Sequence, residues 1–191
     1  MTAVGFRVKS GHAIAVALEG SRAAPRVVAR QVVELSDPGT PETRQPYHDG
    51  MFRTEENARE IARRVGIVKR CAKKSVAALV AQMERAEHVP MGAALVVGSL
   101  IDPATVANPH IRAHAHEGRL FRTVLEEALA AHHIACVVIV DKELPARAAK
   151  GLGRPPSAVA RTVAAFGKTL RGTWRAEEKA AATAAWLALP T

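Results

Sequence analysis

Apolar and polar residues alternate along the first 35 positions of the chain. Val4, Phe6 and Val8 are separated by small or polar residues, and a period of two places such side chains on one face of a β-strand. Gly11 and the stretch 20–25 (Gly-Ser-Arg-Ala-Ala-Pro) provide turn residues between the apolar runs. The pattern predicts three consecutive antiparallel strands, at residues 4–9, 12–19 and 26–35.

The next segment, residues 36–52, is rich in residues that interrupt regular structure. It contains three prolines and two glycines, which predicts a loop long enough to be either mobile or functional. A surface connection is the favoured interpretation, and a functional loop is the alternative.

A helical pattern follows this loop. Thr54 is predicted to cap the helix, with Glu55 and Glu56 in its first turn, where acidic side chains interact favourably with the helix dipole. Apolar residues then recur at steps of three and four, which predicts one buried stripe. The stripe consists of Ile61, Val65, Val68, Ala72, Val76, Leu79 and Met83.

The opposite side of this helix is basic. Exposed helix faces are commonly charged, so a solvated face is the favoured interpretation. A ridge that contacts the phosphates of nucleic acid is the alternative. The residues concerned are Arg59, Arg63, Arg70, Lys73 and Lys74.

The rest of the chain predicts two more strands and further helices. Apolar runs at 93–97 and 134–140 are typical of buried strands in parallel sheets. Asn108 is predicted to cap a helix that ends near His133, with Pro109 at its first position. A turn at 151–156 and helices at 157–166 and 177–189 complete the chain. The order is three antiparallel strands followed by helix, strand, helix, strand and helix, which is an α/β fold.

The composition of the chain adds expectations about its domain count, its core and its partners. At 191 residues the chain suits one domain, residues 1–191, and the low aromatic content of 4% predicts a core of small side chains. The net charge of +9 favours polyanionic partners such as DNA or RNA. We expect no signal peptide and no membrane span. Cys71 and Cys136 are predicted to be free thiols, as in a cytoplasmic protein.

The order of strands and helices is similar to that of RNase H-like domains. Three segments of the C-terminal half resemble the end of RuvC-type Holliday-junction resolvases. They are Lys150-Gly-Leu-Gly-Arg154, the helix at 157–166, and Ala176-Glu-Glu-Lys-Ala-Ala-Ala182. In that family a glycine-containing turn precedes a short helix, and an acidic, alanine-rich helix ends the domain. The resemblance implies a mixed five-stranded sheet with helices on both faces.

RuvC-type enzymes cut DNA with metal ions that four carboxylates hold, because clustered carboxylates bind the two cations that activate water. The resemblance places the first-strand carboxylate at Arg7, and the fourth-strand carboxylate at Gly98 or Ser99. It places the last-helix pair near Glu177 and Ala180. Arginine repels a divalent cation. The resemblance therefore implies the fold and argues against the reaction.

Two other carboxylates are weak catalytic candidates. Glu178 lies beside Glu177 and could help it. Asp141 follows the last predicted strand and faces the same edge of the sheet. A charged turn is the simpler interpretation of Asp141.

A separate set of metal-ligating residues lies on the helix that Asn108 begins. His110, His114 and Glu117 are spaced to share one helix face. Two imidazoles and a carboxylate suit zinc or manganese. Histidines at the start of a helix also commonly cap backbone groups or contact solvent, and that alternative stays open. Any cofactor implied by these residues is a divalent metal, Zn, Mn or Mg.

These features support three functional hypotheses. The first is a non-catalytic RuvC-like protein that binds nucleic acid through Arg7 and the basic helix face. The second is a metal-dependent nuclease or hydrolase with a rebuilt His/Glu site, and the third is an assembly module such as a homodimer. The chain has no P-loop, GxSxG or CxxC motif, which removes support for nucleotide hydrolysis by a P-loop and for disulfide exchange. Whether Arg7 and His114 converge in one cleft is the most informative structural question.

Overall fold

The computed structural model describes residues 1–50 and 53–191; Met51 and Phe52, the last residues of the predicted loop, lie outside the described residues. The strands are β1 (Thr2–Lys9), β2 (His12–Gly20), β3 (Pro25–Glu34), β4 (Pro90–Val97) and β5 (Cys136–Val140). The α-helices are α1 (Ala58–Arg85), α2 (Pro109–Ala130), α3 (Leu144–Leu152), α4 (Pro156–Phe166) and α5 (Ala176–Ala188). Short 3-10 helices lie at Pro41–Arg44, Pro103–Thr105 and Asp141–Glu143.

The five strands form one mixed sheet in the order β3-β2-β1-β4-β5. β1 and β3 both pair antiparallel with β2. β4 is parallel to β1, and β5 is parallel to β4. The predicted meander and the two parallel strands are confirmed. Because β1, β4 and β5 run in the same direction, their carboxyl ends meet at one edge of the sheet.

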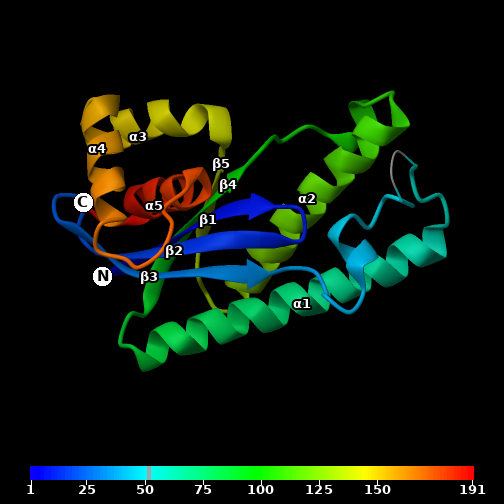
Figure 1. Ribbon diagram of the computed structural model, residues 1–191, viewed down its shortest axis with the longest axis horizontal. Coiled ribbons are helices and arrows are strands. Elements are labelled where there is room, and N and C mark those ends of the chain that lie inside the picture. Colours follow the sequence, from blue (N-terminus) through cyan, green and yellow to red (C-terminus); the bar gives the residue numbers. More distant parts are fainter. Residues whose placement is uncertain (51–52) are drawn as a thin grey trace.

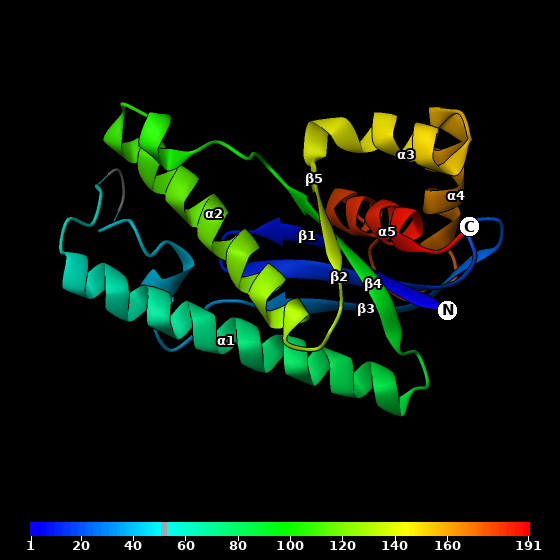
Figure 2. The same cartoon turned by 180° about the vertical axis from the view of Figure 1, so that it is seen from behind.

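Helices cover both faces of this sheet (Figures 1 and 2). α1 and α2 lie on one face, and α5 lies on the other with α3 and α4 beside it. Side chains alternate along β1 between the two cores: Phe6 packs in the core that contains Phe121, whereas Ala3 packs in the core that contains Trp186. None of the described helices is both long and apolar enough to cross a membrane.

Small residues allow α5 to lie directly on the central strand. A Cβ atom at Gly5 of β1 would lie 1.9 Å from the Ala181 carbonyl oxygen and 2.5 Å from the Ala185 nitrogen. Both atoms belong to the backbone of α5, so a side chain at position 5 could not be accommodated by a change of rotamer. The alanine-rich sequence of α5 and the glycine of β1 are thus parts of one close contact.

The start of α1 differs from the prediction. Asn57, and not Thr54, is the N-cap: its side chain accepts hydrogen bonds from the backbone N–H groups of Arg59 and Glu60. Thr54 instead forms an isolated β-bridge with His48 in the preceding loop. Thr54 and Glu55 pair with that loop, and the helix begins after them.

Helix α3 was not predicted. A turn is expected from the sequence at 151–156, but Leu144–Leu152 is helical and ends at Gly153, whose φ is +60°. Only Leu144 and Ala148 of this helix are buried. Two buried residues over nine positions give too little apolar periodicity for a sequence-based assignment.

A glycine-to-alanine change should have opposite effects at two positions of this fold. Gly5→Ala should lower the free energy of unfolding by about 3 kcal/mol or more, because the new methyl group meets the backbone of α5. Gly118→Ala should raise it by about 0.5–1 kcal/mol, because Gly118 is inside α2 and a Cβ there meets nothing within 4 Å. Urea unfolding of both variants measures this difference. Equal stability of the two would contradict the packing of α5 on β1.

Candidate functional site

A cleft of about 290 Å³ lies where the carboxyl ends of β1 and β4 meet α2. Its walls include Arg7 and Lys9 from β1, Gly98 and Ser99 from the end of β4, and His114 from α2. Arg7 and His114 therefore converge in one cleft. The positions that the resemblance assigned to the first and fourth strands also meet there, and neither carries a carboxylate.

Arg7 is held in place by an ion pair across the edge of the sheet. Its Nη2 lies 2.9 Å from Oδ2 of Asp141, which follows β5. Its Nη1 also donates to the Val96 carbonyl at 3.4 Å, and its side chain is 14% exposed. The carboxylate of Asp141 therefore neutralises the guanidinium of Arg7. Asp141 is not directed, together with other described carboxylates, at one point where a metal ion could bind.

The two glutamates at the start of α5 also face cations. Glu177 Oε1 lies 3.9 Å from Lys9 Nζ, at the cleft. Glu178 accepts a hydrogen bond from the Arg175 backbone N–H at 2.9 Å, which caps α5, and its other oxygen lies 3.8 Å from Arg30 Nη1. Each of the three candidate carboxylates therefore has a basic partner of its own. Within residues 1–50 and 53–191, no group of ligands that could hold a metal includes any of them.

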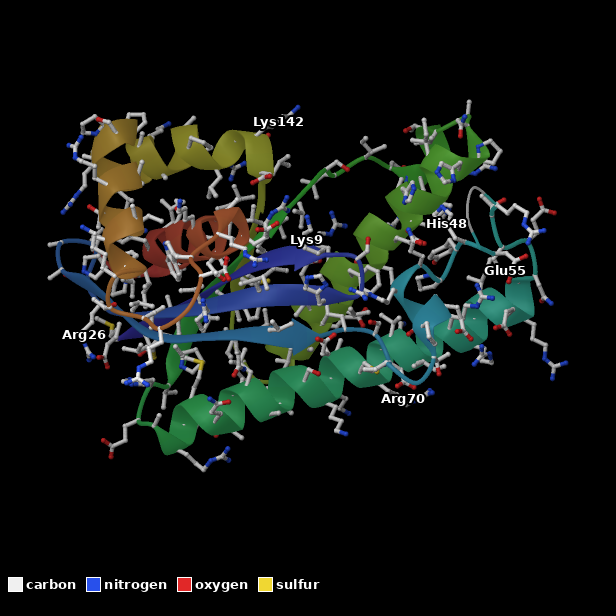
Figure 3. All side chains as sticks on the ribbon, viewed as in Figure 1. Lys9, Arg26, His48, Glu55, Arg70 and Lys142 are labelled. Carbon is white, nitrogen blue, oxygen red and sulfur yellow. The ribbon has the colours of Figure 1, made fainter. Side chains whose placement is uncertain are left out.

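Three histidines form a cluster beside this cleft. His48 comes from the loop before α1, and His110 and His114 from the first turns of α2. Their ring centroids lie 4.4–5.0 Å apart, and one nitrogen of each lies within 4.8 Å of the others. Figure 3 labels His48 on the loop beside the first turns of α2, and Lys9 at the end of β1. His114 belongs both to the cluster and to the cleft wall.

Glu117 lies behind these rings. It is only 1% exposed; its Oε1 is 2.7 Å from His48 Nδ1 and its Oε2 is 3.3 Å from His114 Nδ1. It also accepts the Tyr47 backbone N–H at 3.4 Å. The predicted set of His110, His114 and Glu117 is thus brought together. His48, which was not predicted, completes the imidazole cluster, and Glu117 contacts two of its rings from behind.

Burial controls the protonation of this group. Burial raises the pKa of Glu117 to about 7, although the charge of His114 acts in the opposite direction. Burial also lowers the pKa of His48 below its ordinary value. Both shifts favour the uncharged forms. His116 lies outside the cluster, where its ring stacks on Tyr47 with centroids 4.8 Å apart.

Arg64 fixes the loop that carries His48. Its Nη1 donates to the His48 carbonyl at 2.7 Å, and its other nitrogens bond Glu55 at 2.8 Å and Glu60 at 3.0 Å. The loop is therefore no mere surface connection, since His48 is only 5% exposed. At the start of α1, Ile61 and Val65 were predicted to be buried, but they are only half-buried. Arg64 is the buried residue in this part of the helix.

Sequence reasoning missed His48 and Arg64 for different reasons. His48 lies in a proline-rich loop without periodicity, so only the structure brings it to α2. Arg64 had a detectable signal, because it precedes Val68 and Ala72 at steps of four on the buried face of α1. An arginine at a core position of a helix indicates a buried polar network.

The basic face of α1 is exposed, but its residues differ in their surroundings. Arg63 lies 3.1 Å from Glu42 and 2.6 Å from Glu60. Hydrogen bonds from Arg63 and Arg64 lower the pKa of Glu60 to about 2. The other four basic residues of this face form no ion pair with any described residue. They are Arg59, Arg70, Lys73 and Lys74.

Comparisons with known proteins support the fold. No protein-family model and no curated protein matches the chain. Among solved structures, RuvC from Thermus thermophilus is similar over 100% of both chains, with 15% identity and a TM-score of 0.55. The same protein in complex with a Holliday junction substrate is similar over 100% of this chain and 99% of that chain, with 14% identity and a TM-score of 0.54. The chain has an RNase H-like, RuvC-like fold, which confirms the prediction.

Two neighbouring arginines of α1 should differ in their effect on stability. Arg64→Ala should lower the free energy of unfolding by about 2–3 kcal/mol, because it removes the donor to the buried His48 carbonyl and one donor each from Glu55 and Glu60. Arg63→Ala should cost less than about 1 kcal/mol, because its ion pairs are exposed to solvent. Urea unfolding monitored by circular dichroism distinguishes the two. A similar loss in both variants would contradict the anchoring role of Arg64.

Proposed function

We propose that this chain is a RuvC-like domain that binds nucleic acid through phosphate contacts and does not cut it by carboxylate-held metal ions. The observation that carries the proposal is the Arg7–Asp141 ion pair in the cleft between β1 and β4. The lining of this cleft includes Arg7 and Lys9 and no described carboxylate.

A basic cleft is incompatible with the two-metal reaction. Two divalent cations need several carboxylates directed at one point. A guanidinium about 4 Å from one such ion would cost on the order of 8 kcal/mol at an effective dielectric constant of about 20. Asp141 and Glu177 are paired with Arg7 and Lys9, respectively. The same cations favour the phosphates of a nucleic-acid backbone.

Charge outside the cleft supports the same partner. The net charge is +9, and Arg59, Arg70, Lys73 and Lys74 of α1 are exposed without ion pairs to described residues. Phosphate contacts of this kind give affinity with little sequence selectivity. Because RuvC from Thermus has this fold and has been seen with a Holliday junction substrate, branched DNA is the first ligand to test.

A metal-dependent hydrolase is the second candidate. The observation in its favour is that His114 lines the cleft and also belongs to the histidine cluster. A metal at that cluster would lie at the wall of the cleft where a phosphate would bind. No observation on the described residues specifically favours the third hypothesis, an assembly module such as a homodimer.

The salt dependence of DNA binding tests the basic face of α1. Arg70 and Lys73 together are changed to Glu; Arg63 is left in place because its ion pairs support the loop before α1. Loss of two phosphate contacts should reduce the slope of log affinity against log salt by about two units. Fluorescence anisotropy with branched and linear DNA gives this slope.

In the matched control, Arg161 of α4 and Lys168, which follows α4, are both changed to Glu. Both residues are exposed, and the change in net charge is the same. We expect this control to keep most of the parent slope. A folded α1 variant that binds like the parent would exclude α1 as the contact surface. If the parent itself fails to bind at low salt, the nucleic-acid proposal is wrong and the assembly module is favoured.

Cleavage assays test the proposal that the protein does not cut nucleic acid with carboxylate-held metal ions. The protein should leave branched and linear DNA intact with magnesium or manganese, because Asp141 and Glu177, beside the cleft, are paired with basic residues. Specific cleavage that Glu177→Ala abolishes would overturn this expectation and restore a carboxylate mechanism. Cleavage that instead depends on zinc and is lost in His114→Ala would favour the hydrolase.

A further inference from the structure

The three clustered histidines have the properties of a metal site, whatever the protein binds in its cleft. His48 and the pair on α2 come from segments far apart in the sequence, yet their rings lie mutually within 5.0 Å. Capping of α2 does not explain them, because the side chain of Asn108 already accepts the Ile111 N–H.

His48 provides an independent indication of a ligand. Its side chain is 4% exposed, and its Nε2 is buried without a hydrogen-bond partner in the structure. A buried polar atom without a partner is costly, so native structures rarely keep one without a ligand, water or ion nearby. Because Nδ1 of His48 faces Glu117 at 2.7 Å, Nε2 is the nitrogen left to bind a metal.

Glu117 has the position of a residue that orients metal ligands. Histidines that bind metals commonly hydrogen-bond a carboxylate through their other ring nitrogen, which fixes the ring and raises its basicity. Glu117 is hydrogen-bonded in this way to His48 and to His114 through their Nδ1 atoms. Arg64 adds a further restraint by bonding the His48 carbonyl at 2.7 Å.

We propose that His48, His110 and His114 bind one zinc ion, with Glu117 as the residue that orients two of the three imidazoles. The proposal does not depend on nucleic-acid binding.

Magnesium and calcium prefer oxygen ligands in larger numbers, whereas imidazole suits zinc. Ligand nitrogens about 2.0–2.1 Å from tetrahedral zinc lie roughly 3.4 Å apart, so the nitrogens, now within 4.8 Å of one another, need to close by at most about 1.5 Å.

Three protein ligands leave zinc with one position for water or another oxygen ligand. His114 is both a proposed ligand and part of the wall of the Arg7 cleft. A zinc ion at this site would therefore add a divalent cation, beside Arg7 and Lys9, at the cleft. The oxygens of a bound phosphate fit such a site, which gives the metal a role in binding even without hydrolysis.

Zinc titration of the chelator-stripped protein tests the proposal. We expect one zinc ion per chain by isothermal titration calorimetry and a rise of several degrees in the unfolding midpoint, since a ligand of the folded state stabilises it. Magnesium at the same concentration should produce neither. Zinc should also protect His114, but not His132, from carbethoxylation by diethyl pyrocarbonate in the unaltered protein, as mapped by mass spectrometry.

Three variants assign the ion to this cluster. His114→Ala should fold, because that side chain is 47% exposed, and should lose the tight 1:1 binding. Glu117→Gln should keep 1:1 binding with affinity about 10- to 100-fold weaker. His132→Ala, at the other end of the same helix, should bind like the parent.

Zinc binding by His114→Ala that matches the parent would overturn the proposal, and so would weak binding spread over many histidines. If either cluster variant fails to fold, the protection experiment on the unaltered protein decides the question alone. Unprotected His114 at saturating zinc then rejects the site.

Discussion

The contact between Gly5 and the backbone of α5 sets the geometry of the whole domain. With a Cβ only 1.9 Å from the Ala181 carbonyl oxygen, no other residue at position 5 would let the helix lie where it does. β1 is the central strand, and its carboxyl end carries Arg7 and Lys9. α5 brings Glu177 to 3.9 Å from Lys9. The close packing of small residues in the core thus determines which charges meet in the cleft.

The fold and the chemistry of its cleft depend on different residues. The two cores consist of apolar side chains on alternate faces of the strands, and none of the charged residues of the cleft contributes to them. A RuvC-like architecture can therefore persist when arginine and lysine occupy the cleft. In this chain Asp141 and Glu177 lie beside the cleft and pair with Arg7 and Lys9, and further positive charge lies on exposed helix surfaces.

Most of the fold could be predicted from local patterns. The alternation of Val4, Phe6 and Val8 identified β1, and the apolar stripe of α1 was correct from Val68 onward. The errors have physical causes: α3 buries only two residues, and the start of α1 depends on pairing between Thr54 and His48. His110, His114 and Glu117 were found because helix geometry relates them. His48 was not, because no local rule relates a loop to a helix.

The polar network around Glu117 takes the place of an apolar core beneath the loop before α1. Few side chains of that loop are buried, and those include His48 and Thr43, which are polar. The loop is held instead by Arg64 and by the hydrogen bonds of Glu117 to His48 and to the Tyr47 N–H. Burying a carboxylate beside imidazoles is a weak way to stabilise a fold, since apolar residues of similar volume often do it better. A network that holds this loop and also directs imidazoles at one point is the arrangement that the proposed zinc site requires.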